Sequence, residues 1–93
     1  MSDPGYEIVW SLTARRDVVR LPEKVATAVI EFVYGPLAER PHRTGAALKF
    51  VLEGLHGAPR GDYRIVYAID DEARVVNVVT IDHRSDVYRR RQR

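Results

Sequence analysis

The sequence predicts an α+β domain in which two N-terminal helices pack on one face of a four-stranded antiparallel sheet. Two periodicities indicate this class: apolar residues recur at helical spacing in the first third of the chain, and from residue 48 onward they follow a period of two. Short, turn-rich segments separate the strand-like stretches of the second part, which is typical of antiparallel hairpins.

The N-terminal part predicts one strand and two helices. Residues 6–12 (YEIVWSL) alternate well enough to form a first strand. Thr13 can cap a helix over ARRDVVRL, and Pro22 is expected at the first position of a second helix. The second helix has apolar residues at helical spacing, namely Val25, Val29, Phe32 and Val33. Gly35-Pro36 marks its end, although residues 37–40 can continue as a further turn, and residues 40–47 (RPHRTGAA) are predicted to form a loop.

The remainder predicts three strands. Residues 48–55 (LKFVLEGL) are expected to form a strand that ends at Gly54, followed by a turn over 57–61 (GAPRG). In residues 62–69 (DYRIVYAI) the larger side chains recur at every second position, from Tyr63 to Ile69, and a tight acidic turn over 70–73 leads to 74–81 (RVVNVVTI). The last stretch is apolar on both faces near its middle, which indicates a central strand.

Length and composition predict one compact domain over residues 1–93. There is no cysteine, which excludes disulfides and thiolate chemistry and fits a reducing cytosol. No segment resembles a signal peptide, and no apolar run approaches the ~20 residues that span a bilayer. A cytoplasmic protein without a membrane partner is the simplest expectation.

The positive charge is made almost entirely of arginine. Thirteen of the fifteen cationic residues are arginine, and only Lys24 and Lys49 are lysine. The planar guanidinium suits phosphate recognition, although a GC-rich genome explains the same bias. Because the net charge is only +2, a phosphate-binding surface has to be a local patch.

Arg64 is the first candidate site residue. A mid-strand arginine is costly to bury without a partner, so it either pairs with a carboxylate or faces an open surface. Since the turn at 70–73 is short, Arg64 is expected nearly opposite residues 79–81. It would then lie close to His83, Arg84 and Tyr88, although a histidine at a strand end is more often structural than catalytic.

Cations and proton-carrying groups at one sheet edge suit RNA cleavage. A base takes the 2′-hydroxyl proton, cations stabilise the phosphorane, and an acid protonates the leaving 5′-oxygen. Because the nucleophile is part of the substrate, no metal or other cofactor is expected. Other chemistries lack their motifs: there is no glycine-rich phosphate loop, the three histidines lack metal-site spacing, and no serine lies in a nucleophile elbow.

Two long segments resemble a known family. LEGLHGAPRGDYRIVYAID, followed by VVNVVTIDHRSDVYRR, resembles the RelE/ParE superfamily of toxins from type II toxin–antitoxin modules, and in particular actinobacterial members of the RelE branch. The shared features are a leucine–glycine–leucine turn, an arginine–glycine–x–tyrosine–arginine segment, an isoleucine–x–tyrosine strand and a closing histidine–arginine–x–x–x–tyrosine motif. Here they fall on Leu52, Gly54, Leu55, Arg60, Gly61, Tyr63, Arg64, Ile65, Tyr67, His83, Arg84 and Tyr88.

The resemblance implies a RelE/ParE-like fold and a ribosome-dependent mRNA endoribonuclease that acts in the ribosomal A site, without a metal, and so inhibits translation. By motif, Arg64 would stabilise the phosphorane and Arg84 would neutralise the scissile phosphate. Tyr88 would act on the 2′-hydroxyl side, and His83 would assist proton transfer. The approach to RNA and ribosome would be lined by Lys49, Arg60 and, more weakly, Arg43.

The resemblance also implies a cognate RelB-like antitoxin, with operator DNA bound only through that antitoxin. The chain departs from the family at GAAL (45–48), where many relatives have a basic residue at the position of Ala46. Two alternatives therefore stand beside the nuclease: a ParE-like inhibitor that binds DNA gyrase without chemistry, and a relative that binds antitoxin but no longer cuts RNA. The grouping of His83, Arg84 and Tyr88 favours the nuclease.

Overall fold

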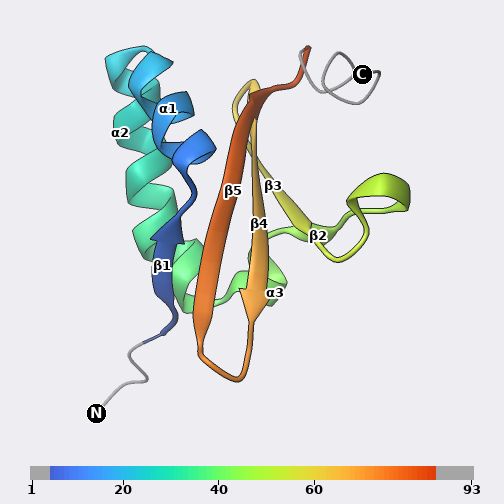
Figure 1. Ribbon diagram of the computed structural model, residues 1–93. Helices are drawn as coiled ribbons and strands as arrows, with labels where there is room; N and C mark the ends of the chain where they lie inside the picture. Colours follow the sequence, from blue (N-terminus) through green and yellow to red (C-terminus); the bar gives the residue numbers. More distant parts are fainter. Residues whose placement is uncertain (1–4, 86–93) are drawn as a thin grey trace.

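The computed structural model describes residues 5–85, which form one sheet with a helical layer on one face (Figure 1). The helices are α1 (Leu12–Arg20), α2 (Glu23–Phe32) and α3 (Pro41–Thr44), with a π-helical segment over Val33–Leu37 and a 3-10 turn over Phe50–Leu52. The strands are β1 (Glu7–Trp10), β2 (Ala46–Ala47), β3 (His56–Arg60), β4 (Tyr63–Asp70) and β5 (Val75–His83).

The predicted α+β class is confirmed, but the sheet has five strands and not four. The strand order is β1-β5-β4-β3-β2, and β1 runs parallel to β5 while the other neighbours are antiparallel. Helices α1 and α2 lie side by side and connect β1 to the rest of the chain (Figure 1). Because this helical connection returns the chain to the far side of the sheet, β1 can join β5 in the parallel sense.

The strand predicted over 48–55 is wrong. Residues 50–52 form a 3-10 turn, and β3 instead runs through the segment that was expected to be a turn. Pro59 is tolerated within β3 because β2 pairs only with His56 and Gly57, so the outer edge of β3 is open beyond that point. The predicted loop over 40–47 contains α3 and β2.

The helix boundaries differ from the prediction by a few residues. Ser11, and not Thr13, caps α1: its hydroxyl accepts a hydrogen bond from the backbone N–H of Ala14 at 2.9 Å. Pro22 is the N-cap of α2 rather than its first residue. Helical structure continues past Gly35-Pro36, in agreement with the further turn expected over residues 37–40. A π-helical turn over Val33–Leu37 accommodates Pro36, which lacks the N–H of a regular turn.

The core lies between the helical layer and β3–β5. Its buried side chains are Ala14, Val29, Phe32, Val33, Leu37, Ala58, Ile65, Tyr67, Val76, Val78 and Ile81. A register shift between Val66 and Tyr67 pairs Ile65 with Ile81 and Tyr67 with Val78, so both strands keep the same face toward the helices. No helix among residues 5–85 is long and apolar enough to cross a membrane.

Helix α1 closes the edge of β5 where β1 ends. Ser11 donates its backbone N–H to the Val78 carbonyl at 2.9 Å and its hydroxyl to the Val79 carbonyl at 2.6 Å. Farther along, the backbone N–H of Ile81 donates to a carboxylate oxygen of the buried Asp17 at 2.9 Å. These bonds satisfy the backbone of β5 and fix the strand end that leads to His83.

Candidate functional site

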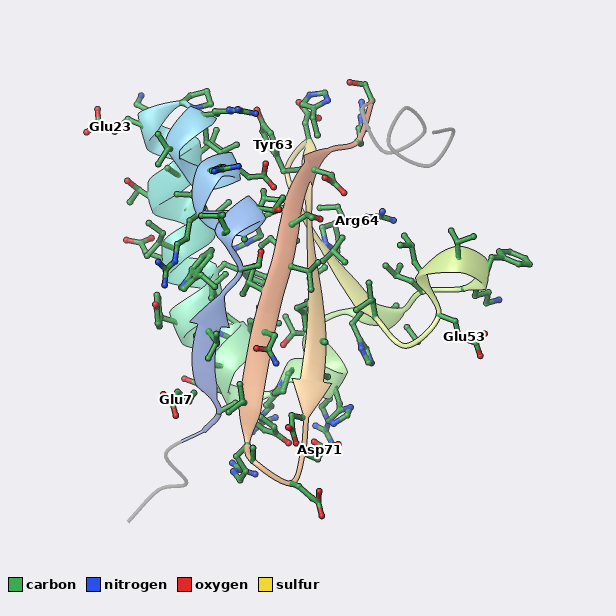
Figure 2. The ribbon with its side chains drawn as sticks, in the orientation of Figure 1. Glu7, Glu23, Glu53, Tyr63, Arg64 and Asp71 are labelled. Carbon is green, nitrogen blue, oxygen red and sulfur yellow. The ribbon has the colours of Figure 1, made fainter. Side chains whose placement is uncertain are left out.

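Arg64 lies on β4, on the face of the sheet away from α1 and α2, which is called the open face below (Figure 2). Its neighbour Ile65 is fully buried in the core on the other face, as strand alternation requires. The half-buried Arg64 side chain passes over Gly57 of β3: a methyl group at Gly57 would lie 3.1 Å from Cδ of Arg64. Glycine thus leaves room for the arginine to lie along the sheet.

The residue directly opposite Arg64 is Asp82, just beyond the predicted 79–81 range. The difference arises because the register shift after Val66 leaves Val79 of β5 without a partner on β4. Asp82 is only 6% exposed, and one of its carboxylate oxygens accepts a hydrogen bond from the Thr80 hydroxyl at 3.3 Å. Directly opposite residues share a face, so the open face has a carboxylate beside its arginine. Sequence reasoning did not single out Asp82, although strand alternation offered a signal.

His83 lies on the helix side of the sheet, not beside Arg64. It pairs with Tyr63, and the two rings meet edge to face with centroids 5.1 Å apart. Its Nδ1 lies 2.7 Å from the Ser85 hydroxyl and accepts the Ser85 backbone N–H at 3.2 Å. In this geometry a neutral His83 has its proton on Nε2. The structure therefore does not bring Arg64 and His83 together.

Arg84 lies at the same end of the sheet as Arg64. Its backbone N–H donates to the Asp62 carbonyl at 2.8 Å, which extends the β4–β5 pairing by one step. Its Nε is 3.8 Å from the Asp62 carboxylate, and because both side chains are exposed this contact is weak and leaves Arg84 accessible. Tyr88 lies outside the described residues.

The three cations expected along the RNA approach lie in different places. Lys49 is exposed at the start of the 3-10 turn, on the hairpin that leaves the sheet on the open side (Figure 1). Arg60 lies on the helix side, with its guanidinium carbon 4.5 Å from the centroid of the Phe32 ring. Arg43 is exposed on α3, near the β4–β5 turn. Of these three, Lys49 is the one on the Arg64 side.

A second polar cluster joins α3 and β1 to the β4–β5 turn. Asp71 accepts hydrogen bonds from the Tyr6 hydroxyl at 2.7 Å and from Nε2 of His42 at 2.8 Å, and the bond from Tyr6, followed by that from His42, lowers the pKa of Asp71. Behind it, burial and, to a lesser extent, nearby His42 lower the pKa of His56. Within residues 5–85 no group of three or more His, Cys, Asp and Glu side chains is arranged to hold a metal ion. The hydrogen bonds of this cluster link α3 and the start of β1 to the β4–β5 turn, so its role is structural.

Buried Tyr67 anchors α3 against the sheet. Its hydroxyl donates to the Pro41 carbonyl at 2.7 Å, and its ring stacks on His56 with centroids 5.5 Å apart. Burial raises the pKa of Tyr67 to about 12, although a hydrogen bond with the backbone of Gly45 acts in the opposite direction. The Tyr67 hydroxyl is therefore a structural hydrogen-bond donor in the core, and it is not part of the candidate site on the open face.

This fold, with an arginine-bearing open face, belongs to a known class of bacterial toxins. The family model described as the ParE toxin of type II toxin–antitoxin system, parDE, matches residues 8–88, and the chain belongs to this family. Toxin RelE of Mycobacterium tuberculosis is 54% identical over 87 residues, covering 94% of this chain and 90% of that protein. Toxin RelG of the same organism is 45% identical over 85 residues, covering 91% and 98%. The predicted RelE-branch resemblance is confirmed.

Solved structures agree with this assignment. The toxin–antitoxin complex RelBE2 from Mycobacterium tuberculosis contains a chain that matches with a TM-score of 0.82 and 42% identity, covering 85% of this chain and 98% of that chain. A mutant of the E. coli toxin RelE in the free state matches with a TM-score of 0.72 at 21% identity, covering 91% and 92%, which supports the fold alone.

Proposed function

We propose that this toxin is a ribosome-dependent mRNA endoribonuclease that cuts in the A site and inhibits translation. The observation that supports it most is the placement of Arg64: over Gly57, opposite Asp82, on the face that the helices leave uncovered. The similarity to toxin RelE at 54% identity and to toxin RelG at 45% identity favours the same function.

The proposed reaction needs no group beyond the protein and the RNA. The 2′-oxygen attacks the adjacent phosphorus, the bond to the 5′-oxygen breaks, the 2′-proton leaves and the 5′-oxygen gains a proton. The products are a 2′,3′-cyclic phosphate and a 5′-hydroxyl. Arg64 would stabilise the charge that builds up on the phosphorane, and donors placed in this way contribute roughly 10²–10³-fold in rate.

Most of the other predicted residues keep the roles that the family resemblance implies. Arg84 would be the second cation on the phosphate, and Tyr88 would act on the 2′-hydroxyl side. His83, held against Tyr63 and Ser85 on the helix side, would position the end of β5 rather than move substrate protons. Lys49 on the open side, Arg60 on the helix side and Arg43 on α3 would contact the RNA or the ribosome.

We also propose a RelB-like antitoxin as the partner that neutralises the toxin, with operator DNA bound through the antitoxin. The helical layer offers a surface for it. Exposed apolar side chains there are Leu12, Val19, Ile30 and Tyr34, and a cavity of about 260 Å³ is lined by Trp10, Arg15, Val18, Ile30 and Tyr34. An amphipathic helix with acidic flanks would suit this groove. The cytoplasm, where mRNA is translated, is the compartment this function requires.

Primer extension on an mRNA that is being translated by purified ribosomes tests the nuclease. Wild type should cut inside codons, and Arg64→Ala and Tyr88→Phe should each cut at least about 100-fold more slowly. Arg16→Ala, an exposed arginine of α1 on the helix side, is the matched charge control and should cut normally. Circular dichroism checks that each variant is folded.

The same preparations separate the alternatives. The matching family model is that of ParE toxins, so a supercoiling assay with DNA gyrase belongs beside the cleavage assay. Intact mRNA together with inhibited gyrase would establish the protein-binding alternative. Intact mRNA with normal gyrase would indicate a relative that no longer cuts. Equal cutting of free RNA would show that the ribosome is not required.

A further inference from the structure

A protruding hairpin presents two apolar side chains to solvent. Residues 48–55, called the finger below, connect β2 to β3 and project from the sheet on the side away from α1 and α2 (Figure 1). At its tip Phe50 is 88% exposed and Val51 is 82% exposed. The Phe50 ring therefore contributes little burial to the stability of the fold.

The backbone at Phe50 is also in an unusual conformation. Its φ angle is +60°, in the left-handed region that bulky residues avoid. The finger is nevertheless well closed, with backbone hydrogen bonds from Leu48 to Leu55 at 2.9 Å, Glu53 to Phe50 at 3.0 Å and Leu55 to Leu52 at 3.0 Å. Neither packing nor backbone conformation favours phenylalanine here, so an external partner is the remaining physical reason for the ring.

The base of the finger lies beside the proposed catalytic arginine. A methyl group at Gly57 would touch both Cδ of Arg64, at 3.1 Å, and a methyl carbon of Leu48, at 3.2 Å. Phe50 is two residues beyond Leu48, and two extended residues span about 7 Å. The finger that carries Phe50 is thus attached to the sheet directly beside Arg64.

The charges around the ring favour a nucleic acid over a protein. The exposed Lys49 precedes Phe50, and Arg64 lies on the same side of the sheet, whereas Glu53 points away from Arg64 in Figure 2. Proteins hold single-stranded nucleic acid by stacking bases on aromatic rings while cations follow the backbone. The larger apolar surface suited to a protein partner lies on the helical layer instead.

We infer that Phe50 is a stacking residue that receives an unpaired base of the RNA whose phosphate lies at Arg64. This inference rests on the endoribonuclease function proposed above. Lys49 neutralises a neighbouring phosphate, and the finger and the open face together hold a short stretch of single-stranded RNA.

Ring replacements at Phe50 test this inference. The probe is a ribosome programmed with an mRNA whose A-site codon has 2′-O-methyl groups and so cannot be cut; binding of fluorescently labelled toxin gives the dissociation constant. Phe50→Ala and Phe50→Leu should bind roughly 5- to 100-fold more weakly, and Phe50→Trp should bind at least as tightly as wild type. On cleavable mRNA the same variants should raise KM and leave kcat within about twofold.

A control variant and three contrary outcomes test whether Phe50 stacks on an RNA base. Arg16→Ala removes an exposed side chain on α1, away from the finger, and it should leave binding and cleavage unchanged. If Phe50→Leu binds the ribosome–mRNA complex with full affinity, the stacking role is wrong. It is also wrong if Phe50→Ala cuts mRNA normally but is no longer neutralised by the antitoxin; the finger would then be a contact for that protein. If wild type cuts and every Phe50 variant behaves like it, the stacking role alone fails. If wild type does not cut, the function fails first and the inference with it.

Discussion

Replacing Phe50 by glycine should stabilise the fold while weakening RNA binding. Glycine adopts the same φ of +60° without the steric clash of a Cβ atom, which gains about 1–2 kcal/mol. Against this, glycine makes the unfolded chain freer by about 0.4–1 kcal/mol, and a ring that is 88% exposed forfeits only a few tenths of a kcal/mol in burial. The net gain is about 0.5 kcal/mol, or about 2–4 °C in Tm for a domain of this size, measurable by thermal and urea unfolding.

Val51→Gly is the matched control because Val51 is the next residue, is similarly exposed at 82%, and is not among the residues with positive φ. It loses burial and gains unfolded-state entropy without any relief of backbone strain, so it should lower stability by about 0.5–1 kcal/mol. The two substitutions are expected to have opposite signs. Equal losses in both would refute the assignment of strain to Phe50, and with it the argument that the fold does not select this ring.

Two further predictions concern the region behind α3. Tyr67→Phe removes the buried hydroxyl that donates to the Pro41 carbonyl, and it should lower the free energy of unfolding by about 1–3 kcal/mol in urea titrations. Tyr34→Phe is the control: its exposed hydroxyl accepts a hydrogen bond from the Trp10 indole N–H at 2.9 Å, which water can replace, so this change should cost no more than about 0.5 kcal/mol. Burial lowers the pKa of His56 in the folded protein, so below about pH 6.5 the unfolded chain binds more protons than the folded one. The free energy of unfolding of wild type should therefore decrease as the pH drops below about 6.5. In His56→Gln this decrease should be smaller.

The contrary results are specific for each. Equal effects of the two tyrosine changes would mean that the buried hydroxyl contributes no more than the exposed one. An unchanged slope of unfolding free energy against pH in His56→Gln would assign the acid sensitivity to another group. A rise in wild-type stability on acidification would contradict the lowered pKa altogether.

The strands that follow local rules were predictable, and those that depend on distant partners were not. The hairpin of β4 and β5 was predicted within a few residues because its period and its turn are encoded locally. The parallel pairing of β1 with β5 joins segments more than 60 residues apart, and no local turn motif predicts such a pairing. β3 was missed because Gly57 and Pro59 are turn-forming residues, and only its place at an open edge makes them acceptable.

The candidate site shows the same division. Arg64 was found because an arginine stands out in an apolar strand. The two alternatives predicted for it, a carboxylate partner and an open surface, are both represented, because it lies on the open face directly opposite the buried carboxylate of Asp82. His83 was expected beside Arg64 because the prediction used only its distance along the strand and not the face of the sheet to which it points. Adjacent residues of a strand point to opposite faces, so Asp82, and not His83, shares the open face with Arg64. Phe50 was overlooked because its exposure and its φ angle are properties of the folded turn.

The hydrogen bonds that Ser11 and Asp17 make to β5 restrict how a partner can approach. Together with β1 they occupy that edge from Val75 to Ile81, so an incoming strand cannot add to it. The opposite edge offers only residues 58–60 of β3 beyond β2, and Pro59 supplies no amide donor there. β-Augmentation of this sheet is therefore restricted to the outer edges of two short strands, β1 and β2, and to the last residues of β3, so a partner that covers Arg64 is expected to do so mainly with helices or loops.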